Sequence, residues 1–295
     1  MSSEFKGIVL RIGATAFFTL MVVFIKFLAD TVPVGQVVFY RSAFALIPLV
    51  LYLMLTREFP SGLRTKRPGS HVLRCLLGCM AMFASFASLK FLPLSHASII
   101  GYLAPVLAVA LAAVLLREVV SNARWFGVIF GLIGVLILVL PSATAAEVDR
   151  AYLIGVGLAF AMAVLTAGAK IQIRSLALTE NAGAIAFYFA LTCTVAGLAT
   201  IGFGWVTPTW EQLGLLICTG LAGGVAHILM TVSYQHSDVS KLAAFEYLSL
   251  IFAVLADALF FDILPEPVFY LSAALIIGAT LIVALKDTRR KEQTA

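Results

Sequence analysis

Charged residues are scarce in this sequence: only 12% of its 295 residues are Asp, Glu, Lys or Arg, whereas 62% are hydrophobic. A water-soluble domain carries about a quarter charged residues. Polar connections are also short, and the longest runs only from Thr56 to Ser70. The chain therefore lacks the material for a soluble surface or an extramembrane domain, and we expect its function to lie within a membrane.

Metal, redox and catalytic motifs are missing as well. The cysteines have no CxxC spacing, and all lie in apolar runs: Cys75, Cys79, Cys193 and Cys218. Buried thiols behave as small hydrophobic groups, so we expect no disulfide, metal or redox site. The sequence contains no HExxH, no GxSG and no Walker A pattern. We expect no cofactor and no catalytic residue, although an intramembrane enzyme and a channel remain the alternative classes.

Apolar runs of about twenty residues are what the sequence does contain, and each is long enough to cross a hydrocarbon core of ~30 Å. The first run is too long for the apolar part of a cleavable signal, so we expect it to remain as a span. The runs predict an all-α polytopic membrane protein with ten transmembrane helices. These are expected at Gly7–Ala29, Val34–Leu55, His71–Phe91, Ser95–Leu116, Arg124–Leu140, Ala151–Gln172, Asn181–Trp205, Gln212–Tyr234, Val239–Phe261 and Pro267–Leu285.

Basic residues are concentrated on alternate connections. The net charge of +5 is scattered over helix ends, which disfavours nucleic acid as a partner. If the N-terminus is cytoplasmic, only Lys26, Lys90 and Arg150 fall on the outer side. Arg41 lies inside a span, and all other basic residues, including Arg74 and Lys170 at span ends, fall on the inner side. The positive-inside rule therefore predicts that both termini are cytoplasmic. The short loops fit a bacterial inner (plasma) membrane.

The sequence contains an internal repeat. The stretch Lys90–Glu118 resembles the stretch Ser240–Asp262, and Tyr102 aligns with Tyr247. Further matches pair Phe39-Tyr40-Arg41 with Phe187-Tyr188-Phe189, and Ile25-Lys26 with Ala169-Lys170. We therefore predict two five-helix repeats, residues 1–142 and residues 143–295, the second ending in a short cytoplasmic tail. A five-span unit is odd-numbered, so the second copy must be inverted, as is common in secondary transporters with a midplane substrate site.

The sequence resembles the drug/metabolite transporter superfamily, specifically its ten-span EamA-type members. The resemblance covers nearly the whole chain and rests on four motifs: Phe39-Tyr40-Arg41, ASLKFLPLSHA from Ala87, YLAP from Tyr102 and LRE from Leu116. It implies alternating-access transport of small metabolites such as amino acids, vitamins or nucleotide-like compounds. The second half departs from the pattern at Phe189, Leu250 and Asp262.

Ionisable residues within predicted spans call for a reason, because each costs ~2.5–3.5 kcal/mol at the bilayer centre. Glu246 and His227 reach similar depths, and we predict that they bind substrate and carry a coupling proton. A structural hydrogen bond between helices is the alternative. Arg41 is predicted to clamp a substrate carboxylate or phosphate, or else to extend to the interface. Asp257, three turns after Glu246, is expected at the exit of an aqueous path or solvated near the surface.

Tyr102 and Tyr247 occupy equivalent repeat positions, so both are predicted to line a central substrate site, with packing as the alternative. Pro105 is expected to kink its span. Small residues in spans 5 and 10 are expected to mediate close helix packing or assembly of a homodimer, although a monomer is equally compatible. These residues are Gly127, Gly131, Ala274 and Gly278.

The predicted function is secondary transport of a small organic metabolite, an amino acid or a similar zwitterionic or aromatic solute, with proton coupling as one mode of energisation. Transport of a vitamin such as riboflavin is the alternative, because an aromatic pocket accepts a flat ring equally well.

Overall fold

The computed structural model describes residues 3–115, 122–144, 149–176, 179–236 and 248–294, together with Leu242 and Phe245. All regular structure in these ranges is helical, with no strand, and this confirms the predicted all-α class. The helices are α1 (Ser3–Leu28), α2 (Val34–Leu55), the short η1 (Ser61–Leu63), α3 (Pro68–Ser88), α4 (Leu94–Gly101), α5 (Leu103–Leu115), α6 (Asn122–Thr144), α7 (Arg150–Leu176), α8 (Ala182–Leu198), α9 (Trp210–His236), α11 (Leu248–Phe261) and α12 (Pro267–Thr294).

The helices have the length and composition of membrane spans. Six apolar segments in the described residues are long enough to cross a bilayer, and four shorter apolar helices accompany them: Trp125–Pro141, Gly183–Leu198, Leu248–Phe261 and Pro267–Ala279. Many large apolar side chains, such as Leu55, Phe203 and Leu259, are exposed on the outside of the bundle. Such a surface suits lipid and not water, so the chain is a multi-pass membrane protein.

The described part of the predicted span Ser95–Leu116 consists of two helices, α4 and α5, that break at Tyr102. The physical reason is Pro105, which has no N–H to donate to the carbonyl group of Gly101 one turn earlier. The Tyr102 N–H is shared between the carbonyl groups of Ser98 and Ile99, both at 3.2 Å. The expected kink is confirmed, and it lies in the middle of a span.

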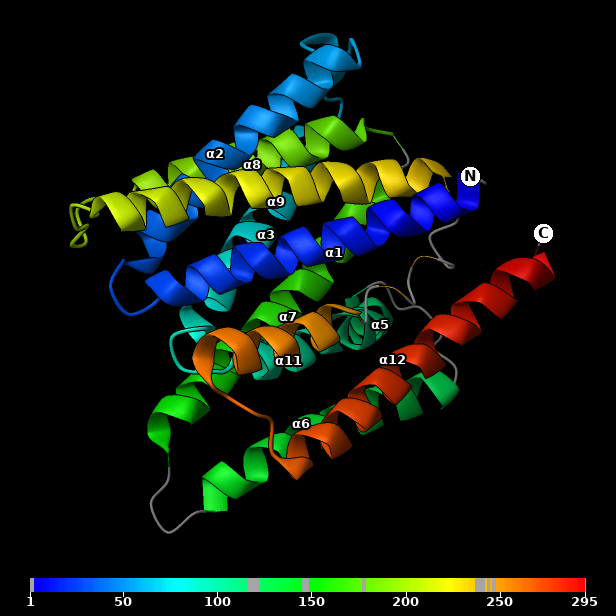
Figure 1. The fold of residues 1–295 in the computed structure, drawn as a ribbon. Helices are drawn as coiled ribbons and strands as arrows, with labels where there is room; N and C mark the ends of the chain where they lie inside the picture. Colours follow the sequence, from blue (N-terminus) through cyan, green and yellow to red (C-terminus); the bar gives the residue numbers. More distant parts are fainter. Residues whose placement is uncertain are drawn as a thin grey trace.

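Every helix of the first half lies against a helix of the second half. α1 packs along α9, α2 packs against α8 and α9, α3 packs along α7, α4 contacts α11, and α6 packs along α12. Both chain termini lie at the same end of the bundle, on the right in Figure 1. A continuous core of buried apolar side chains runs between the halves and includes Ile99, Ile100, Leu103 and Phe269. The halves therefore share one core.

Close backbone contact between α2 and α8 depends on glycine. A Cβ atom at Gly197 would lie 2.6 Å from the backbone nitrogen of Phe39, and one at Gly35 would overlap the Thr200 side chain. In the α6–α12 pair, a Cβ atom at Gly131 would lie 2.9 Å from Leu103, whereas one at Gly278 would meet nothing within 4 Å. Gly131 thus packs within the chain.

The other two small residues of spans 5 and 10 differ in the same way. Gly127 is buried, whereas Ala274 is exposed. The homodimer stays a prediction, and Ala274 and Gly278 lie on the open side of α12, where a second copy could pack.

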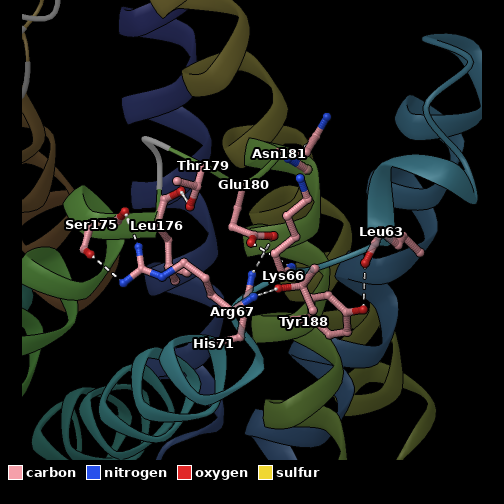
Figure 2. Close-up of polar contacts among 12 residues, drawn as sticks. Leu63, Lys66, Arg67, His71, Ser175, Leu176, Thr179, Glu180, Asn181 and Tyr188 are labelled. Atoms are coloured by element: carbon pink, nitrogen blue, oxygen red, sulfur yellow. Dashed lines mark hydrogen bonds and ion pairs between the residues drawn. The ribbon is translucent and has the colours of Figure 1, made fainter.

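Polar contacts join α3, α7 and α8 at the end of the bundle where α2 ends (Figure 2). Glu180 accepts a hydrogen bond from the Lys66 N–H (3.0 Å) and lies 3.5 Å from His71 Nε2. Arg67 donates to the carbonyl oxygen of Ser175 (2.9 Å) and to its Oγ (3.0 Å). Tyr188 Oη donates to the Leu63 carbonyl oxygen (2.8 Å). At the opposite end, the Gln36 amide bonds both backbone groups of Val206.

Candidate functional site

An open-sided cavity of about 290 Å³ lies between helices of the two halves. This volume is close to the lower limit of small-molecule pockets, roughly 300–1,000 Å³. Its walls come from α1, from both sides of the α4–α5 break, from α7 and from α11. The lining residues are Phe18, Thr19, Val22, Leu94, Ser98, Gly101, Tyr102, Pro105, Lys170, Ser249 and Ala253. Both halves of the chain thus enclose one space, and the broken span forms a large part of its wall.

Tyr102 lies where the sequence predicted it, in the wall of this cavity. Its hydroxyl group is hydrogen-bonded to the hydroxyl group of Ser249, which comes from α11 in the other half. Tyr247, its predicted counterpart, lies outside the described residues, two positions before Ser249. The bond therefore joins the two halves across the cavity at the break in the α4–α5 span.

Several lining residues were not predicted from the sequence. Lys170 was assigned to the cytoplasmic end of its span, yet it lines the cavity. Its alignment with Lys26 was the one available signal, because a cation repeated in both halves marks a shared position. Phe18, Thr19 and Ser249 carried no signal, since an apolar residue or a single hydroxyl on a span does not reveal which way it faces.

The cavity ends against a buried polar contact at the start of α4. Asp257 of α11 is fully buried, and its two carboxylate oxygens accept hydrogen bonds from the N–H groups of Leu94 (2.9 Å) and Ser95 (2.7 Å). A carboxylate here satisfies free N–H groups and faces the positive end of the helix dipole. The expectation that Asp257 is solvated or marks an aqueous exit is therefore wrong, because it caps a helix from the other half.

Lys26 supports the same end of the cavity. Its Nζ donates to the carbonyl oxygens of Leu92 (2.6 Å) and Leu89 (3.3 Å), and it lies 5.4 Å from the centre of the Phe261 ring. These contacts tie the end of α1 to the connection that leads into α4. Lys26 and Asp257 together hold the first turn of α4 in place.

Arg41 and His227, predicted separately, lie together in the interior. Arg41 Nη2 is 3.3 Å from His227 Nε2, and the arginine side chain is buried, so the expectation that it extends to the interface is wrong. Arginine only donates hydrogen bonds, so His227 Nε2 must accept, and the imidazole is neutral with its proton on Nδ1. The His227 ring also meets the Phe18 ring edge-on, with centres 5.0 Å apart.

A second buried arginine lies in the same region. Arg74 of α3 is 8% exposed, and its guanidinium lies over the Phe189 ring of α8 at 4.0 Å. The positive-inside rule predicts Arg74 at the inner side of the membrane. Phe189 aligns with Arg41 in the internal repeat, so the second half supplies an aromatic ring where the first supplies a cation.

Glu246 lies outside the described residues, so its pairing with His227 stays a prediction. Within the described part of the chain, no group of three or more His, Cys, Asp or Glu residues is arranged to hold a metal ion. The buried cysteines Cys75, Cys79 and Cys193 are free thiols, and Cys218 is exposed.

Known proteins resemble this chain over nearly its whole length. The pseudopaline exporter CntI of Pseudomonas aeruginosa is 25% identical over 288 residues, which cover 97% of each chain. The S-adenosylmethionine uptake transporter of Rickettsia bellii is 27% identical over 90% of this chain and 88% of its own. The riboflavin transporter of Rhizobium johnstonii is 28% identical over 89% and 85%.

One solved crystal structure shares the fold, with a TM-score of 0.65 and 22% identity over 96% of this chain and 98% of the other. Residues 5–140 match the EamA-like transporter family. The relatives named above are transporters of different small molecules, and none is named as an enzyme. The match of residues 5–140 and the transporters that resemble the whole chain therefore support an EamA-type small-molecule transporter of the drug/metabolite transporter superfamily, and not an enzyme.

Proposed function

We propose that the protein is a secondary transporter that carries one small organic solute by alternating access, and that the cavity beside the α4–α5 break is its binding site. The main observation in support is that the cavity is lined by α1 and α4–α5 of the first half and by α7 and α11 of the second half. These are the first and fourth spans of each half. A site between two repeats can open to either side when one repeat moves against the other.

The helix packing supports the inverted repeat on which this mechanism depends. The first span of each half packs against the third span of the other half, as α1 does with α9 and α7 does with α3. The second, fourth and fifth spans each contact their own counterparts, in the pairs α2–α8, α4–α11 and α6–α12. An exchange of the two halves therefore preserves these contacts, as an approximate two-fold axis would.

For the substrate we propose an amino acid or a similar zwitterionic or aromatic solute. Phe18 and Tyr102 supply aromatic surface, and the hydroxyl groups of Ser98 and Thr19 supply hydrogen-bonding groups in the same cavity. Lys170 adds a cation that favours a carboxylate. A flat vitamin such as riboflavin is the second candidate, favoured by the same aromatic surface and by the relative that is named a riboflavin transporter.

Counterflow in proteoliposomes tests this function. Vesicles preloaded with an unlabelled amino acid or riboflavin should take up the labelled compound transiently and saturably. Steady conductance would instead favour a channel, and no solute-dependent exchange across a metabolite panel would contradict the proposal.

Tyr102→Phe is the matched site variant for this assay. It keeps the ring but removes the hydroxyl group that lines the cavity and bonds Ser249, so that this group can no longer hydrogen-bond the solute. We expect a several-fold rise in KM, because one such bond contributes about 1 kcal/mol. Tyr270→Phe, on the exposed face of α12, is the control and should leave KM unchanged.

For energisation we propose proton coupling through Glu246, with His227 as its partner. His227 already accepts a hydrogen bond from Arg41, so a proton on its Nε2 must break that contact. Glu246→Gln should therefore abolish the pH dependence of transport while counterflow persists. Unchanged coupling in this variant would remove Glu246 from the mechanism.

We further propose that the protein lies in the cell inner membrane with both termini in the cytoplasm, as the distribution of basic residues predicts. Both termini lie at one end of the bundle, which is compatible with this topology (Figure 1).

A further inference from the structure

We infer that Arg41 and Arg74 form a buried oxyanion-binding subsite beside the transport cavity, which receives the carboxylate or phosphate group of the solute. Phe18 separates this subsite from the cavity. The inference rests on the proposed transport function and narrows the solute to one that carries an oxyanion.

Both guanidinium groups are buried and incompletely bonded. Arg41 is 4% exposed and Arg74 is 8% exposed. Arg41 Nε and Arg74 Nε and Nη1 have no hydrogen-bond partner. Neutral groups surround them: His227 against Arg41, and the Phe189 ring and the Cys75 thiol against Arg74.

No carboxylate among the described residues pairs with either arginine. The buried carboxylate of Asp257 is occupied by the N–H groups of α4, and Glu180 pairs with His71. Removing a cation from water without a counter-charge costs several kcal/mol. Two cations in one interior region that have no carboxylate partner among the described residues therefore favour the binding of an anion.

The two arginines belong to one cluster. Arg41 and Arg74 interact electrostatically with each other, and both act on His227 and on Cys193. They enter from adjacent helices, α2 and α3, and α8 and α9 close the other sides. Each guanidinium group lies against a glycine, where a Cβ atom would press on it. That atom would lie 3.3 Å from Arg41 Nε at Gly223 and 3.1 Å from Arg74 Nη1 at Gly78.

Phe18 connects this cluster with the cavity. One side of its ring lines the cavity, and its contact with the His227 ring places it next to the Arg41 pair. A rotation of this half-buried ring would open a path from the cavity to Arg41. The solute would then place its oxyanion between the guanidinium groups, while the rest of it stays in the aromatic cavity.

The guanidinium group is suited to this task, because its planar fork binds carboxylate and phosphate oxygens through two parallel N–H donors. The unpartnered Nε of each arginine is one of those donors. Lysine at the same position would supply charge without the fork.

Thermal unfolding of the purified full-length protein in detergent tests the subsite without reference to transport. Sodium acetate or inorganic phosphate replaces chloride at constant ionic strength, and acetamide is the neutral control. Because a ligand that binds only the folded state stabilises it by mass action, the Tm of the wild type should rise with acetate or phosphate and then saturate. A Tm rise with acetate alone would indicate a carboxylate subsite, and a Tm rise with phosphate alone would indicate a phosphate subsite.

Arg74→Met should lose this rise and should have a higher Tm than the wild type without added anion, because it removes an unpaired buried charge. If Arg74 only stabilised the fold, Arg74→Met would instead have a lower Tm than the wild type. Arg74→Lys keeps the charge and should raise the half-saturating acetate concentration roughly tenfold. Arg150→Met, at an exposed position, is the matched control and should respond like the wild type.

The inference is overturned if neither anion stabilises the wild type more than acetamide, or if the Arg74→Met and Arg74→Lys variants both respond like the wild type. Counterflow of a solute would remain intact in that case, so a failure of the subsite is distinguishable from a failure of the transport function.

Discussion

Asp257 shows how one residue can connect the two halves of the chain. Its carboxylate uses both oxygens for the N–H groups at the start of α4, the helix whose other end breaks at the cavity. Lys26 lies nearby and bonds the carbonyl oxygen of Leu92 just before the same helix. A shift of α11 must therefore move α4, or else leave two buried donors without a partner.

Asp257→Asn should destabilise the protein by about 1–3 kcal/mol, because the amide NH₂ group would face a backbone N–H that needs an acceptor. Asp149→Asn is the matched control, since Asp149 Oδ1 accepts one bond from the exposed Tyr152 N–H and an asparagine oxygen caps equally well. Thermal unfolding in detergent compares the two. Equal small effects would mean that the Asp257 contacts contribute little.

At the scale of elements, α2 and α8 approach until their backbones touch. Gly197 faces the backbone of Phe39 and the carbonyl oxygen of Gly35, and neither can move aside as a side chain can. This contact joins the second spans of the two halves. Helix pairs in membranes commonly use small residues in this way, because dispersion contacts replace the hydrophobic effect.

Gly197→Ala should therefore lower the unfolding temperature, with a cost of about 1–3 kcal/mol for overpacking. Gly214→Ala, on the open side of α9, meets nothing within 4 Å and should be neutral or slightly stabilising, because alanine favours helix over glycine. If Gly197→Ala left the unfolding temperature unchanged, the two helices would be able to move apart without loss of stability.

Glu180 is the acidic centre of the contacts that hold α3, α7 and α8 together (Figure 2). Burial raises the pKa of this carboxyl group, but hydrogen bonds from Lys66 and Thr65 and the contact with His71 outweigh it, so the pKa lies below its usual value. A lowered pKa means that the folded state favours the carboxylate. The resulting stability is present above the unfolded pKa, about 4.3, and disappears as the pH falls through the folded pKa.

The Tm difference between the wild type and Glu180→Gln should therefore be largest near neutral pH, and it should shrink as the pH falls below the unfolded pKa of about 4.3 and through the lowered folded pKa. Glu58→Gln changes a half-buried residue of the preceding connection whose carboxylate accepts a 3.4 Å hydrogen bond from the exposed Thr56, and it should show little difference at any pH. A constant difference for Glu180→Gln across the range would mean that its charge is not what stabilises the contact.

Across the whole molecule, the predictable features are those that depend on local composition. Hydropathy predicted the helices that the described residues form, and the bounds of α2 agree with the structure at both ends, because a bilayer selects for length and apolar character alone. Pro105 predicted the broken span because its effect is local. The sequence did not indicate that Lys170 faces the cavity or that Arg74 lies over Phe189, because the direction of a side chain depends on which helices pack together. The expectation for Asp257 was wrong for the same reason, because its partners lie in the other half of the chain and helix packing decides which groups it meets.

Topology is the largest-scale prediction. Alternating helices place the connection after α2 and the connection before α9 at opposite ends of the bundle, and both carry exposed residues, Ser61 and Thr207. In a Cys218→Ser background, Thr207→Cys should react with a membrane-impermeant maleimide in intact cells, because the outer connections carry few basic residues. Ser61→Cys, and cysteines added at either terminus, should react only after permeabilisation. The reverse pattern would place the termini outside, and labelling of the two termini from opposite sides would contradict the inverted repeat and with it the shared cavity.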